Sequence, residues 1–251
     1  MQNNSFDLII IGAGPGGYVG AIRASQLGMN VACIEKRPTL GGTCLNVGCI
    51  PSKALLNASE HFANAASGTL DKLGISVGPV ALDLKQMMES KSGIVDTLTG
   101  GIDFLFKKNK ITRLEGTATI TGAGSMTIVD GKDKGDYKAD KIMIATGSHP
   151  SSLPGITIDE KHIVSSTGAL SFETLPEKMV VIGAGYIGLE LGTVWARLGA
   201  EVEVIEFLPR ILPGVDAEIA KKFMTIAKKQ GLKFRLSTAV KLAKAGKNGV
   251  S

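Results

Sequence analysis

The sequence predicts an α/β fold built from two βαβ units, and three observations lead to this expectation. Of the 251 residues, 44% are hydrophobic and 20% are charged, so the chain is too apolar and too weakly charged to stay disordered. A segment that begins at Asp7 returns at Lys178 with the same alternation of strand and helix patterns. Turn-forming Pro, Gly and Ser residues cluster between the copies, at about residues 148–174. We therefore expect two domains, over residues 1–150 and 151–251.

The repeat itself can be followed residue by residue. DLIIIGAGPGG, from Asp7, matches KMVVIGAGYIG, from Lys178, and the two copies then continue in step. Each copy has the pattern of a strand, a glycine turn, an amphipathic helix and a second strand that ends in a glutamate. These glutamates are Glu35 and Glu206. This order of elements is typical of nucleotide-binding βαβ units, so the sequence predicts two of them.

The glycines of each copy have separate expected roles. Gly12 makes the tight turn after the strand, Gly14 lets the backbone approach a pyrophosphate, and Gly17 lets the helix pack on the strand. Pro15 suits the first helical turn, where its missing N–H costs nothing. The helix N-terminus then favours an anionic group. The matching glycines of the second copy are Gly183, Gly185 and Gly188.

The two glutamates follow their glycine turns by about twenty residues, which is the spacing expected for a carboxylate that accepts hydrogen bonds from ribose hydroxyls. The alternative is a surface carboxylate without a ligand. Glu206 would repel a 2′-phosphate and no arginine follows it directly, which favours NAD over NADP. Arg210 lies close enough in sequence to keep NADP as an alternative.

The stretch GGTCLNVGCIPSK contains two cysteines, Cys44 and Cys49, separated by four residues. Cys49 comes just before Pro51 and a helical apolar pattern, which predicts a thiol at a helix N-terminus. A thiol there has a lowered pKa, and a disulfide across so short a loop suits reversible exchange. A structural disulfide and a zinc half-site are the alternatives, although a second pair of zinc ligands is missing, so we expect no metal. Cys33 lies in an apolar strand pattern and is expected in the core.

Charge and hydropathy narrow the class of protein further. The formal net charge is +5, and the last thirty residues are rich in lysine without the interleaved aromatic residues of a nucleic-acid site, so we expect a solvated helix face. No apolar run reaches the length of a membrane span. A strand pattern begins by Leu8, which leaves no room for a signal peptide. These features, with few cysteines, predict a cytoplasmic protein, or one of the mitochondrial matrix if the source is a eukaryote.

The cysteine stretch, the two glycine motifs and Ala145-Thr146-Gly147 after an apolar strand together resemble the pyridine nucleotide-disulfide oxidoreductases over essentially the whole chain. The CIPSK ending resembles the lipoamide branch more than the glutathione branch. This resemblance implies two Rossmann-like three-layer domains, the first for FAD and the second for NAD, with a small antiparallel β-meander at about residues 111–129. It also implies that the C-terminal part of the family fold, with its dimer domain and His-Glu base, is missing from these residues.

The resemblance also implies an activity. A dihydrolipoyl group, carried by the acyltransferase of a 2-oxo acid dehydrogenase complex, would be oxidised by a homodimeric enzyme that reduces NAD⁺. The substrate thiolate would attack Cys44, Cys49 would be released as a thiolate beside the flavin, and Lys53 would stabilise negative charge on the reduced flavin. The alternatives are another NAD(P)H-dependent disulfide or metal reductase, and a nucleotide-binding fragment without turnover.

The resemblance finally implies a set of cofactor-binding residues. In or near the first repeat they are Gly12, Gly14, Pro15, Gly17, Glu35, Lys36, Gly42, Thr43, Cys44, Lys53, Ala118, Ala145, Thr146 and Gly147. In or near the second they are Gly183, Gly185, Tyr186, Ile187, Gly188, Glu190, Glu206 and Val240. Tyr186 stands where lipoamide-type relatives often carry an aliphatic residue, and it would either cover the nicotinamide pocket or pack in the core. Glu190 would reach the nicotinamide end.

Overall fold

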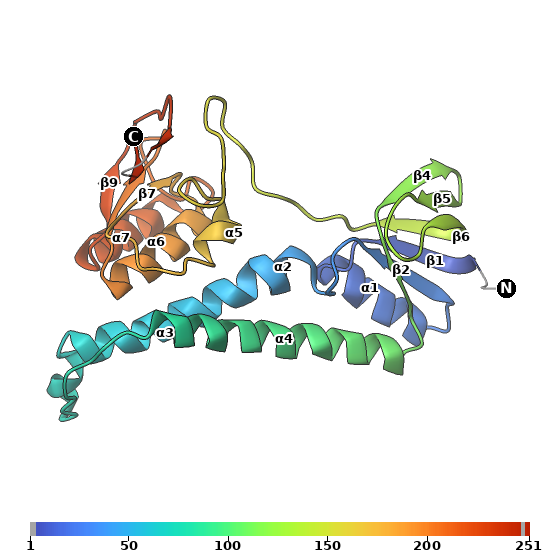
Figure 1. The fold of residues 1–251 in the computed structure, drawn as a ribbon, viewed down its shortest axis with the longest axis horizontal. Coiled ribbons are helices and arrows are strands. Elements are labelled where there is room, and N and C mark those ends of the chain that lie inside the picture. Colours follow the sequence, from blue (N-terminus) through green and yellow to red (C-terminus); the bar gives the residue numbers. More distant parts are fainter. Residues whose placement is uncertain (1–3, 247–248) are drawn as a thin grey trace. The chain divides into compact units, whose positions relative to one another are not determined.

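The computed structural model describes residues 4–246 and 249–251, and the chain divides into two compact units (Figure 1). The first unit comprises Met1–Ile50 and Ser92–His149, and the second comprises Pro51–Lys91 and Pro150–Ser251. Each unit contains one copy of the sequence repeat and its own parallel strands. The predicted α/β fold with two βαβ units is therefore confirmed.

The first unit is built on one six-stranded sheet with the order β3-β2-β1-β6-β5-β4. Its strands are β1 (Ser5–Ile11), β2 (Val31–Glu35), β3 (Thr112–Glu115), β4 (Ala118–Gly122), β5 (Ser125–Ile128) and β6 (Gly135–Ile144). Strands β3, β2, β1 and β6 run parallel, whereas β5 pairs antiparallel with β6 and β4 pairs antiparallel with β5. All five residues of β2 are buried, as expected for a central strand covered on both faces.

The antiparallel meander begins later than the sequence predicted. It consists of β4, β5 and β6, whereas β3, inside the predicted range of 111–129, pairs parallel with β2. The reason is the 25-residue helix α4 (Leu84–Lys108), because a long crossover brings the chain back in the direction of the neighbouring strand. The chain then turns at Gly116, where an added Cβ would lie 2.2 Å from the carbonyl oxygen of Asp130.

Apolar side chains cover both faces of this sheet. Helix α1 (Pro15–Gln26) and the C-terminal half of α4 bury Ile10, Ala21 and Phe106 in one cluster. On the opposite face, Ile9 and Met126 belong to a second cluster to which the meander strands contribute. The result is the layered arrangement expected from the sequence.

The second unit contains a three-stranded parallel sheet in the order β7-β8-β9. Its elements are β7 (Lys178–Ile182), β8 (Glu201–Ile205), β9 (Lys233–Arg235), α5 (Ser166–Ala169), α6 (Tyr186–Leu198), α7 (Ala217–Lys229) and the short pair β10 (Ala245–Gly246) and β11 (Gly249–Val250). Trp195 of α6 is fully buried, and its indole N–H donates to the carbonyl of Ala169 at 3.0 Å. Among the described residues, no helix combines the length and the apolar character needed to cross a lipid bilayer.

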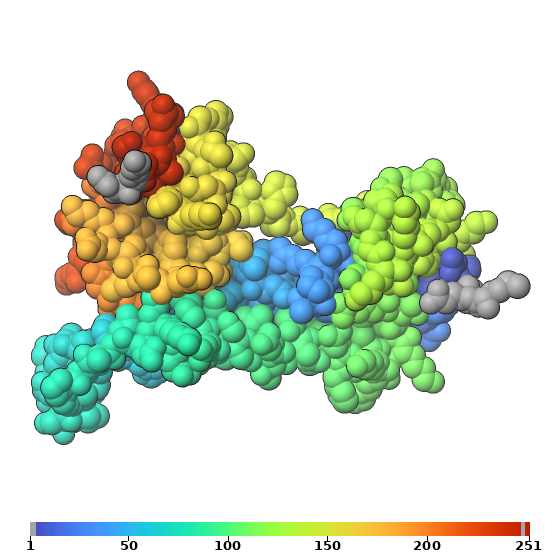
Figure 2. All heavy atoms as spheres, in the orientation of Figure 1, coloured from blue at the N-terminus to red at the C-terminus, as the bar shows by residue number. Residues whose placement is uncertain are grey.

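Helix α3 (Cys49–Ala66) contributes to the core of the second unit through Leu55, which is fully buried there. Between α3 and α4 lie the 3-10 helix η1 (Thr69–Leu73) and an irregular stretch, teal in Figure 2, in which Leu73 and Ile75 are exposed. The predicted turn-rich stretch between the repeats is also largely irregular, apart from α5. The first two residues of α3 therefore belong to the first unit, and the rest of the helix belongs to the second.

The sequence predicted that the basic residues near the end of the chain lie on one solvated helix face, but the structure places only some of them on a helix. Lys221 and Lys228 are exposed on α7 as expected. Lys233 and Arg235 instead lie on β9, where they pair with Glu201 and Glu203 of β8. These cross-strand pairs exist because neighbouring parallel strands place the two charges side by side.

Cys33 gives a testable consequence of burial. Its thiol is fully buried in β2, and burial, followed by the charge of Glu35, raises its pKa from 9.0 to about 12. Between these two pH values the unfolded chain loses the thiol proton while the folded chain keeps it, so the free energy of unfolding falls as pH rises. We expect the stability difference between wild type and Cys33→Ala, measured by denaturant unfolding, to shrink from pH 9 toward pH 12. A difference independent of pH would contradict this assignment.

Candidate functional site

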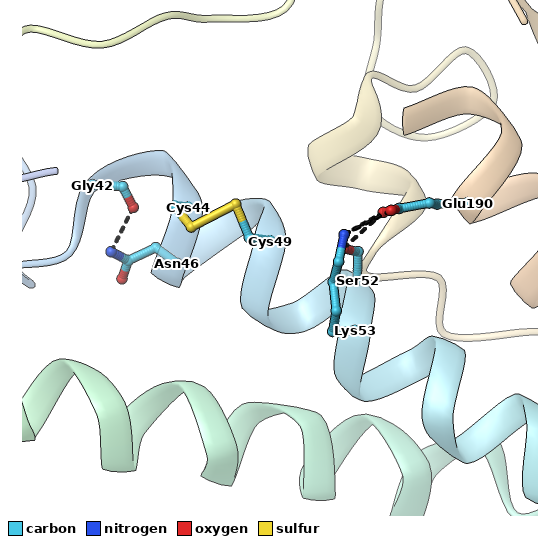
Figure 3. Close-up of a disulfide and its surroundings, with 7 residues drawn as sticks. All are labelled: Gly42, Cys44, Asn46, Cys49, Ser52, Lys53 and Glu190. Atoms are coloured by element: carbon cyan, nitrogen blue, oxygen red, sulfur yellow. Dashed lines mark hydrogen bonds and ion pairs between the residues drawn. A yellow bond between two sulfur atoms is a disulfide. The ribbon is translucent and has the colours of Figure 1, made fainter. Parts of the chain in front are cut away.

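The two cysteines of the GGTCLNVGCIPSK stretch form a disulfide in the first unit (Figure 3). Cys44 lies within α2 (Gly42–Val47), and Cys49 is the first residue of α3. Cys49 is exposed and Cys44 is half-buried. The prediction of a thiol at a helix N-terminus is confirmed for Cys49. The first-turn N–H groups and the dipole of this 18-residue helix favour a thiolate at that position.

Gly48 makes the tight connection between the two cysteine-bearing helices. It is the C-terminal cap of α2 with a non-helical backbone, and the next residue already begins α3. A Cβ at Gly48 would lie 2.9 Å from the carbonyl oxygen of Thr43, too close for any side chain. The glycine therefore allows the chain to pass from α2 to α3 within one residue, with Cys44 and Cys49 close enough to form the disulfide.

The first glycine turn has the packing roles that its motif predicts. Gly12 has a left-handed φ of 99°, and its Cβ would lie 2.4 Å from the carbonyl oxygen of Ala145. Gly17 packs against the turn so closely that an added Cβ would lie 1.7 Å from the carbonyl oxygen of Gly12. Gly14 caps α1, Pro15 is its first residue, and no side chain hydrogen-bonds to that cap.

The cysteine loop touches this turn through backbone alone. A Cβ at Gly42 would lie 2.5 Å from the Cα of Gly14, and the N–H of Gly41 donates to the carbonyl of Ala13 at 2.9 Å. The hydroxyl of Thr43 reaches the carbonyl of Ser148 at 3.3 Å. The structure thus brings the first glycine turn and the start of α2 together.

Each of the two strand-end glutamates closes its own glycine turn. Glu35 accepts from the N–H of Ala13 through Oε2 and from the N–H of Arg37 through Oε1, both at 3.0 Å. Glu206 does the same in the second unit, with Ala184 at 2.7 Å and Leu208 at 2.8 Å. Both carboxylates are buried, so neither is a surface carboxylate. Because each oxygen has a second lone pair, each can still accept a ribose hydroxyl.

The second turn repeats the first with one difference. Gly183 has φ 100°, and a Cβ at Gly188 would lie 2.4 Å from the carbonyl oxygen of Gly183. At Gly183 and Gly185, however, an added Cβ would have no described atom within 4 Å, whereas the first turn contacts α2 and the end of β6. Within the described residues, the second turn therefore lacks the close backbone contacts that the first turn makes.

Lys53 and Glu190 form an ion pair within the second unit (Figure 3). Lys53 Nζ lies 2.7 Å from both carboxylate oxygens, and the hydroxyl of Ser52 donates to Glu190 Oε2 at 3.2 Å. The side chains of Lys53 and Glu190 are 59% and 31% exposed, so the pair adds little to stability and mainly sets the direction of the ammonium group. Lys53 follows Cys49 by about one turn along α3.

The other residues expected to bind cofactor lie at strand ends, at the start of α6 and in one irregular stretch. Lys36 is exposed directly after β2, and Ala118 begins β4, where it pairs with Ile128. The segment that directly follows β6 contains Ala145, Thr146 and Gly147. Helix α6 contains Ile187, which is exposed near its start, and Glu190. Val240 is half-buried in the irregular stretch after β9. Tyr186 is 62% exposed at the first residue of α6, so it does not pack in the core of its unit.

Sequence reasoning missed Asn46, Ser52 and the role of Arg210. Asn46 hydrogen-bonds to Thr39 and Leu40 before α2 and to Gly42 at its start, and Arg210 donates to the carbonyls of Pro213 and Val215. Of these three residues, only Asn46 could have been singled out from the sequence, because it is a polar residue between the two cysteines of the disulfide. Within the described part of the chain, no group of three or more His, Cys, Asp or Glu side chains is arranged to hold a metal ion.

Two nucleotide-type glycine turns and a disulfide at a helix start are the combination expected in the disulfide oxidoreductase class. The chain belongs to the pyridine nucleotide-disulphide oxidoreductases, whose family profile matches residues 6–251. It is 53% identical, over 98% of its length, to dihydrolipoyl dehydrogenase 3 of Pseudomonas aeruginosa. It is 55% identical, over 93% of its length, to the mitochondrial dihydrolipoyl dehydrogenase of Homo sapiens.

These relatives are longer than the chain, which covers 53% of the bacterial protein and 46% of the human one. The chain thus spans about half the length of the curated relatives it matches. Among solved structures, it is similar to the HOCl-induced flavoprotein disulfide reductase RclA of Escherichia coli in its Cu(II) complex, with a TM-score of 0.84 and 27% identity. That match covers 98% of this chain and 52% of the other.

Proposed function

We propose that this chain supplies the disulfide and the two nucleotide sites of a dihydrolipoyl dehydrogenase, which oxidises dihydrolipoyl groups and reduces NAD⁺. The observation that carries the proposal is the Cys44–Cys49 disulfide, with Cys49 at the start of α3. Identity of 53% to dihydrolipoyl dehydrogenase 3 across nearly the whole chain supports it.

The first glycine turn fits the pyrophosphate of FAD, so we assign residues 1–150 as the FAD-binding domain. The N-terminus of α1 has no side-chain cap, and glycines at positions 12, 14 and 42 keep side chains out of its approach. Glu35 would accept from the ribose hydroxyls, while Thr43 and the Ala145–Gly147 segment would contact the rest of the cofactor.

The second turn fits NAD, and we assign residues 151–251 to its binding. The N-terminus of α6 lacks a side-chain cap, and no described side chain lies within 4 Å of a Cβ at Gly183 or Gly185. Glu206 would accept from the adenosine ribose and repel a 2′-phosphate. The guanidinium of Arg210 already donates to two backbone carbonyls, those of Pro213 and Val215, which supports NAD over NADP.

The thiol chemistry needs only the protein's own cysteines. A dihydrolipoyl thiolate attacks Cys44 Sγ, the Cys44–Cys49 bond breaks, and its electron pair leaves on Cys49, stabilised by the start of α3. The second substrate thiol loses its proton and attacks the substrate sulfur of the mixed disulfide. This closes the oxidised substrate and releases Cys44, which takes up that proton, so two electrons and one proton have moved to the protein while Cys49 stays a thiolate.

Bound FAD and NAD⁺ would supply the redox chemistry that passes these two electrons onward as a hydride. Lys53 would hold a positive charge near the flavin, oriented by Glu190. Tyr186, Ile187 and Glu190, at the start of α6, would contact the nicotinamide end, and Val240 would lie near the same nucleotide. Ala118 would contact the adenine of FAD, and Lys36 would lie near its ribose.

The proposal extends to the whole protein. The substrate would be the dihydrolipoyl group of an acyltransferase or carrier domain of a 2-oxo acid dehydrogenase complex, and the full-length enzyme would be a homodimer. The protein would work in the cytoplasm, or in the mitochondrial matrix of a eukaryote.

An absorption spectrum tests the proposed function. The full-length protein is expected to bind FAD and, on anaerobic addition of dihydrolipoamide, to develop a long-wavelength band from a thiolate beside the flavin. NAD⁺ should then discharge that band. A colourless protein, or a flavin that dihydrolipoamide does not reduce, would overturn the proposal.

A second candidate is a reductase of another disulfide or a metal centre, because leghemoglobin reductase of Vigna unguiculata is 55% identical over 93% of this chain. The two candidates are separated by comparing kcat/KM for dihydrolipoamide with values for other disulfides and for ferric haem proteins. We expect dihydrolipoamide to be preferred by at least an order of magnitude.

Glu206→Ala should weaken NAD⁺ binding by about 1–3 kcal/mol, because hydrogen-bonding partners of a charged group lose their acceptor. Preference for NAD⁺ over NADP⁺ should narrow at the same time. The measurement is a calorimetric titration of the full-length protein. Glu203→Ala is the matched control, since Glu203 lies on the same strand but pairs with Arg235 at the surface. Unchanged NAD⁺ affinity in Glu206→Ala would show that the ribose binds elsewhere.

A further inference from the structure

Asn46 uses its whole amide group on the loop that precedes Cys44. Its Nδ2 donates to the carbonyls of Leu40 at 3.0 Å and Gly42 at 2.9 Å. Its Oδ1 accepts from the hydroxyl of Thr39 at 2.6 Å. Figure 3 shows the bond to Gly42 beside the disulfide. Both amide hydrogens and the oxygen are therefore committed to residues 39–42, an arrangement that we call the Asn46 clamp.

The clamped loop is intrinsically flexible. Gly41 and Gly42 both have left-handed φ values, 99° and 58°, and consecutive glycines have more backbone freedom than any other pair of residues. A disulfide-bearing helix that starts on such a pair needs an external constraint to keep one direction. The two carbonyls that Asn46 holds belong to residues on either side of the Gly41 backbone.

The same loop touches the first glycine turn. Gly41 donates to Ala13, and Gly42 lies against Gly14 without room for a Cβ. Cys44 follows Gly42 by two residues in the same short helix. Movement of this loop would therefore displace Cys44 relative to Cys49 and relative to the glycine turn together.

We propose that Asn46 is a positioning residue that tunes the stability of the Cys44–Cys49 disulfide. With the clamp in place, Cys44 stays close to Cys49 even in the dithiol form, so closing the disulfide costs little conformational entropy. Without the clamp, the dithiol form gains freedom that the disulfide form lacks, and the equilibrium shifts toward the dithiol. This role rests on the proposed exchange of the disulfide, but it requires neither cofactor nor substrate.

Asn46→Asp is the most informative variant, because it keeps the shape of the side chain. It replaces the Nδ2 amide nitrogen, which donates to two carbonyls, with a carboxylate oxygen that cannot donate. The chain is equilibrated with mixtures of reduced and oxidised dithiothreitol, and the disulfide fraction is read by alkylation and mass spectrometry. In this exchange the two protein thiols form as dithiothreitol closes its own disulfide, so atoms and electrons balance. We expect the equilibrium to shift about tenfold toward the dithiol, as for loss of roughly one net hydrogen bond.

Asn57→Asp is the matched control, because Asn57 is exposed on α3 and receives the same chemical change. It should leave the equilibrium unchanged. Thr39→Val removes only the bond to Asn46 Oδ1 and should give a smaller shift in the same direction, which keeps the test open if Asn46→Asp does not fold.

The outcomes separate this inference from the proposed function. If both clamp variants lower the melting temperature but leave the dithiothreitol equilibrium as in wild type, Asn46 is purely structural and the inference is wrong. If the wild-type disulfide does not exchange with dithiothreitol at all, the proposed function fails instead. A shift in the clamp variants that the Asn57 control lacks would support the positioning role.

Discussion

Cys44→Ser is expected to abolish thiol exchange with dihydrolipoamide, reducing turnover to background. The loss should be complete because the mixed disulfide with the substrate can no longer form on α2. Cys49 keeps its position at the first residue of α3, where the helix start favours a thiolate. In full-length protein loaded with FAD, Cys44→Ser should therefore retain the long-wavelength thiolate band. Stopped-flow spectroscopy measures both quantities in one experiment.

The reciprocal variant tests the assignment of roles. Cys49→Ser should lose the band, since the thiolate beside the flavin is gone. Cys33→Ala is the control for removing a cysteine, because Cys33 is buried in β2 and takes no part in the disulfide. If Cys49→Ser kept the band while Cys44→Ser lost it, the two roles would be reversed.

Among Gly→Ala changes in the first unit, Gly17→Ala is expected to produce the largest loss of stability, because its added Cβ makes the shortest contact. Its Cβ would lie 1.7 Å from the carbonyl oxygen of Gly12, which is backbone and cannot move without breaking the glycine turn. Overpacking typically costs about 1–3 kcal/mol and occasionally more, and a clash with backbone that cannot move places Gly17→Ala at or above the upper end of this range. The free energy of unfolding from denaturant titration measures the loss, and the flavin content of purified full-length protein should fall with it.

Gly16→Ala is the matched control, one residue earlier in the same helix. An added Cβ there meets only the side chain of Ala145, at 3.9 Å, which is ordinary contact. Since alanine also favours helix over glycine, this variant should be as stable as wild type or slightly more stable. Equal stability of the two alanine variants would show that α1 is not held against the turn as described.

The repeated turn explains why so much of the fold could be predicted. In each copy the glutamate follows the first glycine at the same distance along the chain, and in each it accepts from the residue after that glycine. The left-handed φ at Gly12 and Gly183 and the close packing at Gly17 and Gly188 also match. These features follow from local geometry, since only glycine tolerates both the dihedral angles and the contact.

Predictions that depended on long-range pairing were less accurate. The strand at 112–115 was expected in the meander, but its parallel partner β2 was set by the crossover through α4. The strand pattern alone could not show this, because the residues of β3 would fit either direction. In the same way, the sequence did not indicate that Lys233 and Arg235 would meet glutamates on β8.

The sequence by itself determined the two βαβ units, the cysteine pair at a helix start and the carboxylate after each glycine turn, because each depends on residues close together in the chain. Only the tertiary structure decided which polar groups meet. It paired Lys53 with Glu190, far away in sequence, and directed Arg210 toward backbone carbonyls. It also closed the Asn46 clamp on a glycine pair. Such partners are chosen by packing, which brings donors and acceptors within hydrogen-bond distance only after the strands and helices have assembled.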